Sequence, residues 1–227
     1  MVTIAFFLKR DNALNFKHAR GMLVVGLCGG IGAGKSTVAK LLSLKGAIVI
    51  DVDEIGRAVL DIPAVRKKVI NKFGTQVLKT NGNIDRSALA KKVFTEKTSL
   101  NDLEAISHPF INQELANKLR IIAKESPKSV VILDMAVLVE STLGQLPNGL
   151  GYSKIVVVEA NLKLRLSRLA RRGINNVDAK KRISQQASNE ERRAIANHLL
   201  TNNGDLRTLS IQVDNLWKKL NGEKLKT

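Results

Sequence analysis

The chain has 227 residues, of which 44% are hydrophobic, and its 37 lysines and arginines against 20 acidic residues give a formal net charge of +17. This length fits one domain, or one domain with inserted lobes. No apolar run reaches the roughly 18 residues that a membrane-spanning helix needs. The charge suits anionic partners such as nucleotides, phosphorylated cofactors or nucleic acid, but only 4% of residues are aromatic, so stacking platforms for single-stranded nucleic acid are scarce.

Residues 1–21 precede the first predicted strand, and we expect them to be a disordered extension outside the fold. The apolar stretch 4–8 is too short for a secretory signal and no convincing cleavage site follows it. A transit peptide stays open as an alternative, because the extension holds four lysines and arginines against one acidic residue. The single cysteine, Cys28, excludes an internal disulfide and fits a reducing compartment. We therefore expect a cytoplasmic protein without membrane association.

A glycine-rich stretch, residues 29–37, fits the phosphate-binding loop pattern G-x-x-x-x-G-K-[ST]. Glycines allow positive φ angles and close backbone approach, so that several N–H groups can point at one phosphate. An apolar segment typical of a buried strand precedes it at 23–27, and segment 38–44 after it is typical of a helix that ends near Gly46. The pattern predicts an ATP-binding loop formed by Gly29, Gly30, Ile31, Gly32, Ala33, Gly34, Lys35, Ser36 and Thr37.

Two carboxylates follow the second predicted strand, residues 47–50. Asp51 and Asp53 stand at or just beyond its carboxyl end, where ligands bind in open α/β sheets. Such a pair can orient a nucleophile, hold Mg²⁺ or accept a proton. For Asp53 the alternative is an N-cap, because a short helix is predicted over residues 54–60.

A helical block over residues 64–125 separates the second strand from the third. It is too long for a simple crossover between parallel strands, so it predicts an inserted substrate lobe. Within it, Pro109 is expected in the first turn of a new helix, with His108 as its possible cap. The expected helices cover residues 64–73, 86 to about 94, 100–107 and 109 to about 124.

The third strand, residues 129–134, ends at Asp134, where a carboxylate close to Mg²⁺ would lie. A fourth strand is predicted at 154–159. Its helical continuation is rich in arginine and suits a lid that closes over a nucleotide, whereas a solvated helix face is the alternative for each single arginine. The remaining elements are expected at 162–172, 175–186 and 189–196 (helices), 198–201 (fifth strand) and 205–220 (closing helix).

From Met22 to about Leu220 the chain resembles the dephospho-CoA kinase family. The resemblance rests on the phosphate-binding loop followed, in order, by Ile50-Asp51-Val52-Asp53, Asp85-Arg86 and His108-Pro109. It implies a P-loop NTPase fold, with three α/β/α layers, a five-stranded parallel sheet, an inserted helical lobe and a helical lid. The implied parts are a core (22–63, 126–160 and 197–227), a CoA-binding lobe (64–125) and a lid (161–196).

The family reaction implies ATP and dephospho-CoA as substrates, with Mg²⁺ as cofactor and the ribose 3′-hydroxyl as phosphoryl acceptor. By resemblance, Lys35 neutralises developing charge, Asp53 accepts the hydroxyl proton and Asp51 positions it. Mg²⁺ would be held by Ser36 and, through water, by Asp134. Further ATP contacts are implied at Arg168, Asn202 and Gly204, and further substrate contacts at Arg86, His108 and Glu140.

The chain departs from the family pattern at Ala136, where many members have proline, and at Arg172 and Asn197-His198. Two other interpretations stay open: a nucleoside or nucleotide kinase, and a basic non-catalytic protein that binds nucleic acid. The order of Asp85-Arg86 and His108-Pro109 argues against the first. No helix-turn-helix, RNA-binding aromatic motif or zinc module is present in the sequence, which argues against the second. We expect no specific nucleic acid partner, and the sequence does not give the oligomeric state.

Overall fold

A computed structural model describes residues 21–95, 97–136, 138–139, 143–146 and 150–224. Its centre is a five-stranded sheet of order β2-β3-β1-β4-β5, in which every adjacent pair is parallel. The predicted sheet is confirmed, and each strand end lies within two residues of its expected position. The strands are Leu23–Gly29 (β1), Ile48–Asp51 (β2), Val130–Asp134 (β3), Lys154–Glu159 (β4) and His198–Thr201 (β5).

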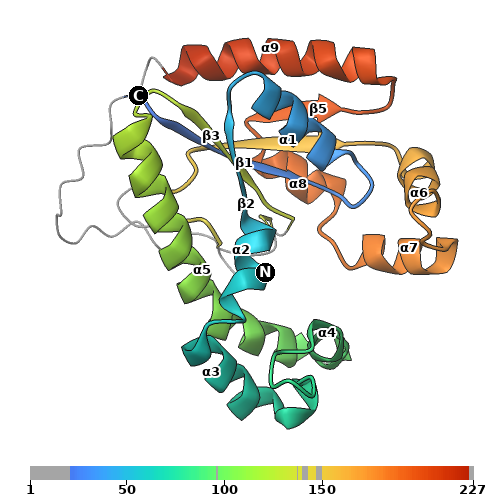
Figure 1. Ribbon diagram of the computed structural model, residues 1–227. Coiled ribbons are helices and arrows are strands. Elements are labelled where there is room, and N and C mark those ends of the chain that lie inside the picture. The colour runs from blue at the N-terminus through green and yellow to red at the C-terminus, as the bar shows by residue number, and fades with distance from the viewer. Residues whose placement is uncertain (1–20, 96, 137, 140–142, 147–149, 225–227) are drawn as a thin grey trace.

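Helices cover both faces of this sheet, which gives the three layers expected from the sequence (Figure 1). Alternate residues of β1 point to opposite faces: Val25 joins one buried cluster and Val24 the other. Against the first face pack α1 (Lys35–Leu44) and α9 (Leu206–Lys224), and against the second α2 (Val52–Val59) and α5 (Lys97–Glu125). Burial on both faces explains the almost uninterrupted apolar runs of the strands.

The helix α5 is a single element of 29 residues with Pro109 in its interior. We expected two helices that meet at this proline, because proline lacks a backbone donor and disfavours a helix interior. That expectation is wrong, and packing along the whole helix explains why. Leu103 and Ile106 pack into the helical lobe, whereas Leu115 belongs to a cluster against the sheet. One continuous helix thus ties the lobe to the core.

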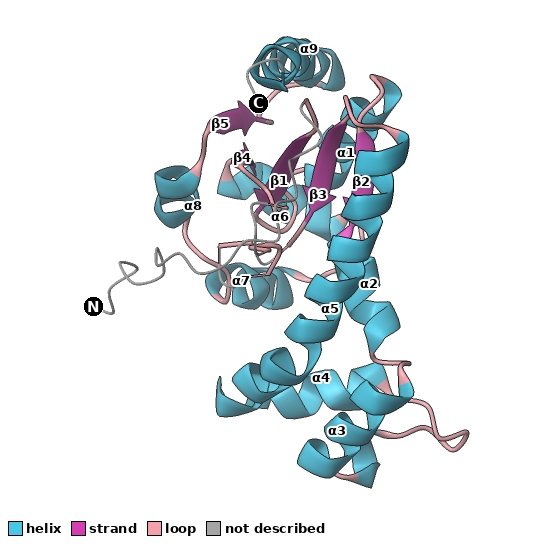
Figure 2. Ribbon diagram, turned by 90° about the vertical axis from the view of Figure 1, so that its left-hand side faces the viewer, coloured by secondary structure: helices cyan, strands magenta, loops and turns pink. Residues whose placement is uncertain are grey.

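The lobe has a buried cluster of its own, distinct from the two on the sheet. It lies at the end of α5 away from the sheet, where α3 (Pro63–Phe73), a short 3₁₀ turn (Thr75–Val77) and α4 (Arg86–Thr95) gather (Figure 2). The turn that precedes α4 has Gly82 at φ 78°, as an asparagine-glycine pair predicts. The cluster is formed by Val65, Val69, Phe73, Val77, Ile84, Leu89 and Val93.

Three helices follow β4: α6 (Leu162–Ala170), α7 (Asn176–Ser184) and α8 (Asn189–Ile195). Each begins at a polar N-cap whose side chain accepts a hydrogen bond from the backbone N–H three residues later. Gly173 separates the first two helices at φ 79°, as predicted. Across the described ranges, no helix combines the length and the apolar character that a membrane crossing requires.

The role of α5 as a tie between the lobe and the core gives a first prediction. Leu115 has no exposed surface, so Leu115→Ala should lower the free energy of unfolding by about 2–5 kcal/mol through lost apolar contact and a residual cavity. On the same helix, Ile121 is 54% exposed, and Ile121→Ala should change stability by less than about 0.5 kcal/mol. Urea denaturation measures both, and equal losses in the two variants would contradict this account of α5.

Candidate active site

The phosphate-binding loop connects the end of β1 to the start of α1. Gly32 and Gly34 have φ angles of 78° and 101°, in the region that only glycine adopts readily. Among the described residues, no acceptor bonds the N–H groups of these glycines or of Lys35 and Ser36. Together with the positive end of the α1 dipole, these N–H groups form a cradle for an anion.

Two side chains support the loop on the side of its carbonyl groups. Arg168 of α6 donates to the carbonyl oxygens of Gly32 and Ala33, both at 3.3 Å, and to that of Asn202 at 3.0 Å. The Asn202 amide donates to the carbonyl of Ala33 at 2.9 Å. The structure therefore brings these two predicted ATP-site residues to the loop backbone. Gly204, the third, is exposed in the turn before α9.

Carboxylates from two neighbouring strands meet beside the loop. The parallel register pairs Asp51 at the end of β2 with Asp134 at the end of β3. Lys35 forms an ion pair with Asp134. Asp53 lies half-buried in the first turn of α2 and accepts a hydrogen bond from the N–H of Ala136 at 3.4 Å. The predicted gathering of these groups at one edge of the sheet is therefore present.

The N-cap of α2 is Asp51, so the alternative that Asp53 caps this helix is wrong. The Asp51 carboxylate accepts a hydrogen bond from the N–H of Glu54 at 2.8 Å and lies 3.5 Å from Arg57. The difference arises because α2 begins at Val52, two residues earlier than expected, directly after the last residue of β2. Asp53 is thereby left without a capping role.

The environment of Asp53 makes it a stronger base than an ordinary aspartate. Burial, the largest influence, raises its pKa from the usual 3.8, and the charges of Asp51 and Asp134 raise it further. Lys35 and the N–H of Ala136 act in the opposite direction and favour the ionised form. Asp53 is thus a carboxylate whose affinity for a proton exceeds that of a solvated one.

A cavity of about 350 Å³ lies between α2, α4 and α5, and Asp53 forms part of its wall. Arg86, at its rim, donates to the backbone carbonyl of Arg57 at 3.1 Å and pairs with Asp61 at 3.2 Å. His108 lines the cavity from inside α5, so the alternative that it caps a helix at Pro109 is wrong. The apolar part of the wall includes Val52, Leu60, Leu89, Val93, Leu103 and Ile111.

Sequence reasoning missed Arg57, which lines this cavity and pairs with Asp51. A usable signal was present: Arg57 stands four residues after Asp53, so the two side chains share one helix face. Glu140, the remaining predicted substrate contact, lies outside the described residues.

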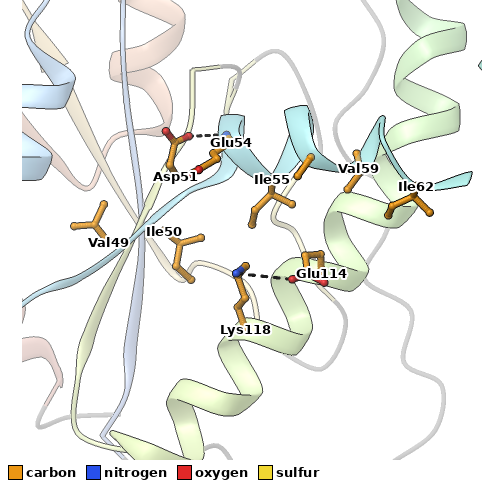
Figure 3. A pocket seen from close by; sticks show the side chains of 10 residues that line it. Val49, Ile50, Asp51, Glu54, Ile55, Val59, Ile62, Glu114 and Lys118 are labelled. Atoms are coloured by element: carbon orange, nitrogen blue, oxygen red, sulfur yellow. Dashed lines mark hydrogen bonds and ion pairs between the residues drawn. The ribbon is translucent and has the colours of Figure 1, made fainter. Parts of the chain in front are cut away.

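A second cavity, of about 450 Å³, lies outside the edge strand β2, between α2 and α5 (Figure 3). Ile55 and Val59 line it from α2, and Lys118 pairs with Glu114 on its α5 side at 3.8 Å. Asp53 does not belong to its lining. Of the two cavities, Asp53 therefore borders the one between α2, α4 and α5.

Comparisons with known proteins show which family the chain is similar to. A curated dephospho-CoA kinase of Thermobifida fusca is 39% identical over 202 residues, which cover 88% of this chain and 96% of that protein. One of Corynebacterium glutamicum is 36% identical over 198 residues, which cover 86% and 98%. The crystal structure of TT1252 from Thermus thermophilus, 30% identical, superposes with a TM-score of 0.72 over 87% of this chain and 97% of that one.

The dephospho-CoA kinase from Campylobacter jejuni, at 22% identity, has a TM-score of 0.63 over 89% of this chain and 98% of that one, a likeness of fold. A sequence model described as dephospho-CoA kinase matches residues 23–208, which include the phosphate-binding loop, the carboxylates and the cavity between α2, α4 and α5. With these matches over most of its length, the chain belongs to the dephospho-CoA kinase family and is a P-loop kinase.

Proposed function

We propose that this protein transfers the γ-phosphoryl group of ATP to the ribose 3′-hydroxyl of dephospho-CoA, giving ADP and CoA. The observation that carries the proposal is the position of Asp53. Its carboxylate is close enough to Lys35 for that charge to lower its pKa, and it lines the cavity between α2, α4 and α5. One group thus borders both the phosphate-binding loop and a cavity for the acceptor.

Lys35 and the loop N–H groups bind the phosphates in this proposal. As the acceptor oxygen bonds to the γ-phosphorus, the bond from that phosphorus to the β-γ bridging oxygen breaks, and negative charge builds on the leaving ADP. A lysine charge and fixed N–H dipoles stabilise such charge without reorganising. Arg168, Asn202 and Gly204 complete the proposed ATP site, the first two through their bonds to the loop and to each other.

Mg²⁺ is part of the proposal, and when bound it neutralises charge on the phosphate oxygens. The residues present fit this ion, because Mg²⁺ in kinases takes one or two protein ligands and completes its octahedron with phosphate and water oxygens. Ser36 offers an exposed hydroxyl in the first turn of α1, and Asp134, paired with the adjacent residue Lys35, offers a carboxylate that can act through water. In the described ranges no three His, Cys, Asp or Glu side chains cluster as a metal cage.

Asp53 accepts the proton of the ribose hydroxyl. Its raised pKa matches this task, since a base works best when its pKa approaches the working pH. Asp51 positions Asp53 indirectly: by capping α2 and pairing with Arg57 it fixes the first turn that carries Asp53. Both aspartates and Lys35 are therefore our proposed catalytic group.

The acceptor is held by the helical lobe, residues 64–125, and by α2. Arg57, Arg86 and His108 offer cationic or polar contacts for an acceptor that carries a diphosphate, and the apolar wall suits its uncharged parts. Glu140 remains a proposed contact. We propose that residues 161–196 form the lid. We also propose a cytoplasmic location, because the single cysteine allows no internal disulfide.

Acceptor-dependent release of ADP tests the proposed reaction. With ATP and Mg²⁺, dephospho-CoA should stimulate turnover, whereas adenosine, AMP and dCMP should not. Asp53→Asn removes the base and should lower kcat by roughly 10²- to 10⁴-fold, the usual effect of a general base. Glu54→Gln, an exposed change of the same kind at the next residue, should keep kcat within about twofold. Stimulation by a nucleoside or nucleotide alone would overturn the proposed substrate.

The same substitution should affect stability in a pH-dependent way. Because the folded pKa of Asp53 is raised, the stability that its carboxyl group contributes is present below about pH 4 and is lost as pH rises through that folded pKa. Asn stays neutral and keeps an acceptor for the N–H of Ala136. Asp53→Asn should therefore melt at a higher temperature than the parent at pH 7, by a margin that shrinks toward pH 4. Scanning calorimetry at several pH values measures this, and a margin that grows at low pH would contradict it.

A further inference from the structure

Ile31, in the phosphate-binding loop, is hydrogen-bonded through both of its backbone polar groups to the helices that follow β4. Its N–H donates to Oε1 of Gln186 at 2.8 Å. Its carbonyl oxygen accepts from Nε of Arg165 at 2.9 Å. Arg165 lies on α6 and Gln186 just beyond the end of α7, at sequence separations of 134 and 155 residues. Two separate parts of the proposed lid therefore meet at one residue of the loop.

The two bonds fix the orientation of the peptide groups on either side of the Ile31 Cα atom. In a trans peptide the carbonyl and the following N–H point in opposite directions. Because Arg165 holds the Ile31 carbonyl, the N–H of Gly32 points away from α6. This N–H is one of the unbonded groups of the phosphate cradle described above. The hydrogen bond to the Ile31 carbonyl on one side of the loop thus orients the Gly32 N–H on the other side.

The approach of α6 is close, and two glycines make it possible. A Cβ atom at Gly30 would lie 2.6 Å from Nη2 of Arg165, and one at Gly32 would lie 2.9 Å from the Arg165 carbonyl oxygen. Both distances are shorter than real Cβ contacts. At Gly32 the contact is with backbone and φ is positive, so only glycine fits there, whereas a Cβ atom at Gly30 would push the Arg165 guanidinium away from Ile31. The loop and α6 therefore have little freedom to shift relative to each other.

Arg165 is a costly choice for this position if its purpose is packing. Its side chain is only 6% exposed, and its Nη2 atom is buried without a hydrogen-bond acceptor in the described part of the chain. Burial lowers its pKa, and the charge of the neighbouring Arg192 lowers it further. An apolar side chain of similar length would avoid both penalties. What it could not supply is the bond to Ile31.

We propose that Arg165 and Gln186 are positioning residues, which hold the peptides flanking Ile31 so that the loop N–H groups meet the phosphates of ATP. The inference rests on the proposed function only in taking ATP as the nucleotide. Neither side chain is assigned a contact with substrate. Their effect passes through the backbone of one loop residue.

The first test replaces Arg165 with methionine, which keeps most of its length and removes the donor. In Arg165→Met, the Kd for ATP, measured by equilibrium dialysis without acceptor, should rise about tenfold, as for the loss of one charged hydrogen bond. The melting temperature of the ATP-free protein should stay the same or rise. Lys163→Met makes the same kind of change at an exposed site of α6 and should leave the Kd unchanged. An unchanged Kd in Arg165→Met, or a lowered melting temperature, would overturn the proposal.

The second test concerns Gln186, which lies nearer the surface and endangers folding less. Gln186→Ala should raise the Kd for ATP about three- to tenfold, because the Ile31 N–H loses its acceptor. Gln185→Ala, its exposed neighbour, serves as the control. Because both residues act on Ile31, the double variant Arg165→Met/Gln186→Ala should bind ATP more tightly than the product of the single effects predicts. Independent, multiplicative effects would overturn the shared mechanism.

Amide hydrogen exchange in the ATP-free protein gives a readout that does not depend on activity. Gln186→Ala removes the acceptor of the Ile31 N–H, so a peptide covering residues 29–37 should exchange faster than in Gln185→Ala. Equal exchange would overturn the proposal. Equilibrium dialysis and hydrogen exchange are both carried out without an acceptor. A finding that the acceptor is not dephospho-CoA would therefore overturn the proposed function but not these results.

Discussion

The parallel sheet concentrates negative charge at one edge, and the charge of Lys35 makes this tolerable. Asp51 and Asp134 are direct neighbours in the register of β2 and β3, and Asp53 follows Asp51 by two residues, in the first turn of α2. Like charges at such spacing repel and resist ionisation. Lys35 pairs with Asp134 and favours the ionised form of Asp53. Since Lys35 is also the first residue of α1, the phosphate-binding loop and the carboxylate group depend on each other.

This arrangement sets the strength of the proposed base by opposing influences. Burial of Asp53 raises its affinity for a proton, and Lys35 limits the rise, so the carboxylate can be ionised before the reaction and still hold a proton after it. The cost falls on stability, because an ionised, half-buried carboxylate is less favourable than a neutral group of the same shape. Function and stability are therefore in direct opposition at this residue.

The sequence indicated the strands and the loop because their signals are local: short apolar runs, three of which end in glycine or aspartate, and a nine-residue motif. It failed where distant packing decides. Pro109 does not divide α5, because buried side chains on both sides of it hold the helix together. Asp51 is the cap because α2 begins directly after β2, two residues before its expected start. The contacts of Arg165 and Gln186 with the loop join residues more than a hundred positions apart in the sequence, so no local pattern predicts them.

Two constraints therefore act on the glycines of the phosphate-binding loop, one from the phosphate and one from the side chains behind the loop. A phosphate explains why the loop must present bare N–H groups, but it does not explain what prevents the opposite, carbonyl face from turning inward. Here that face is occupied: α6 leaves no room for a Cβ atom at Gly32, and a Cβ atom at Gly30 or Gly34 would displace the Arg165 guanidinium or the Asn202 amide. The carbonyls of Ile31, Gly32 and Ala33 all accept bonds from side chains behind the loop. Because the bonded carbonyls of Ile31 and Ala33 turn the N–H groups of Gly32 and Gly34 forward, the cradle is shaped from behind before any anion enters it.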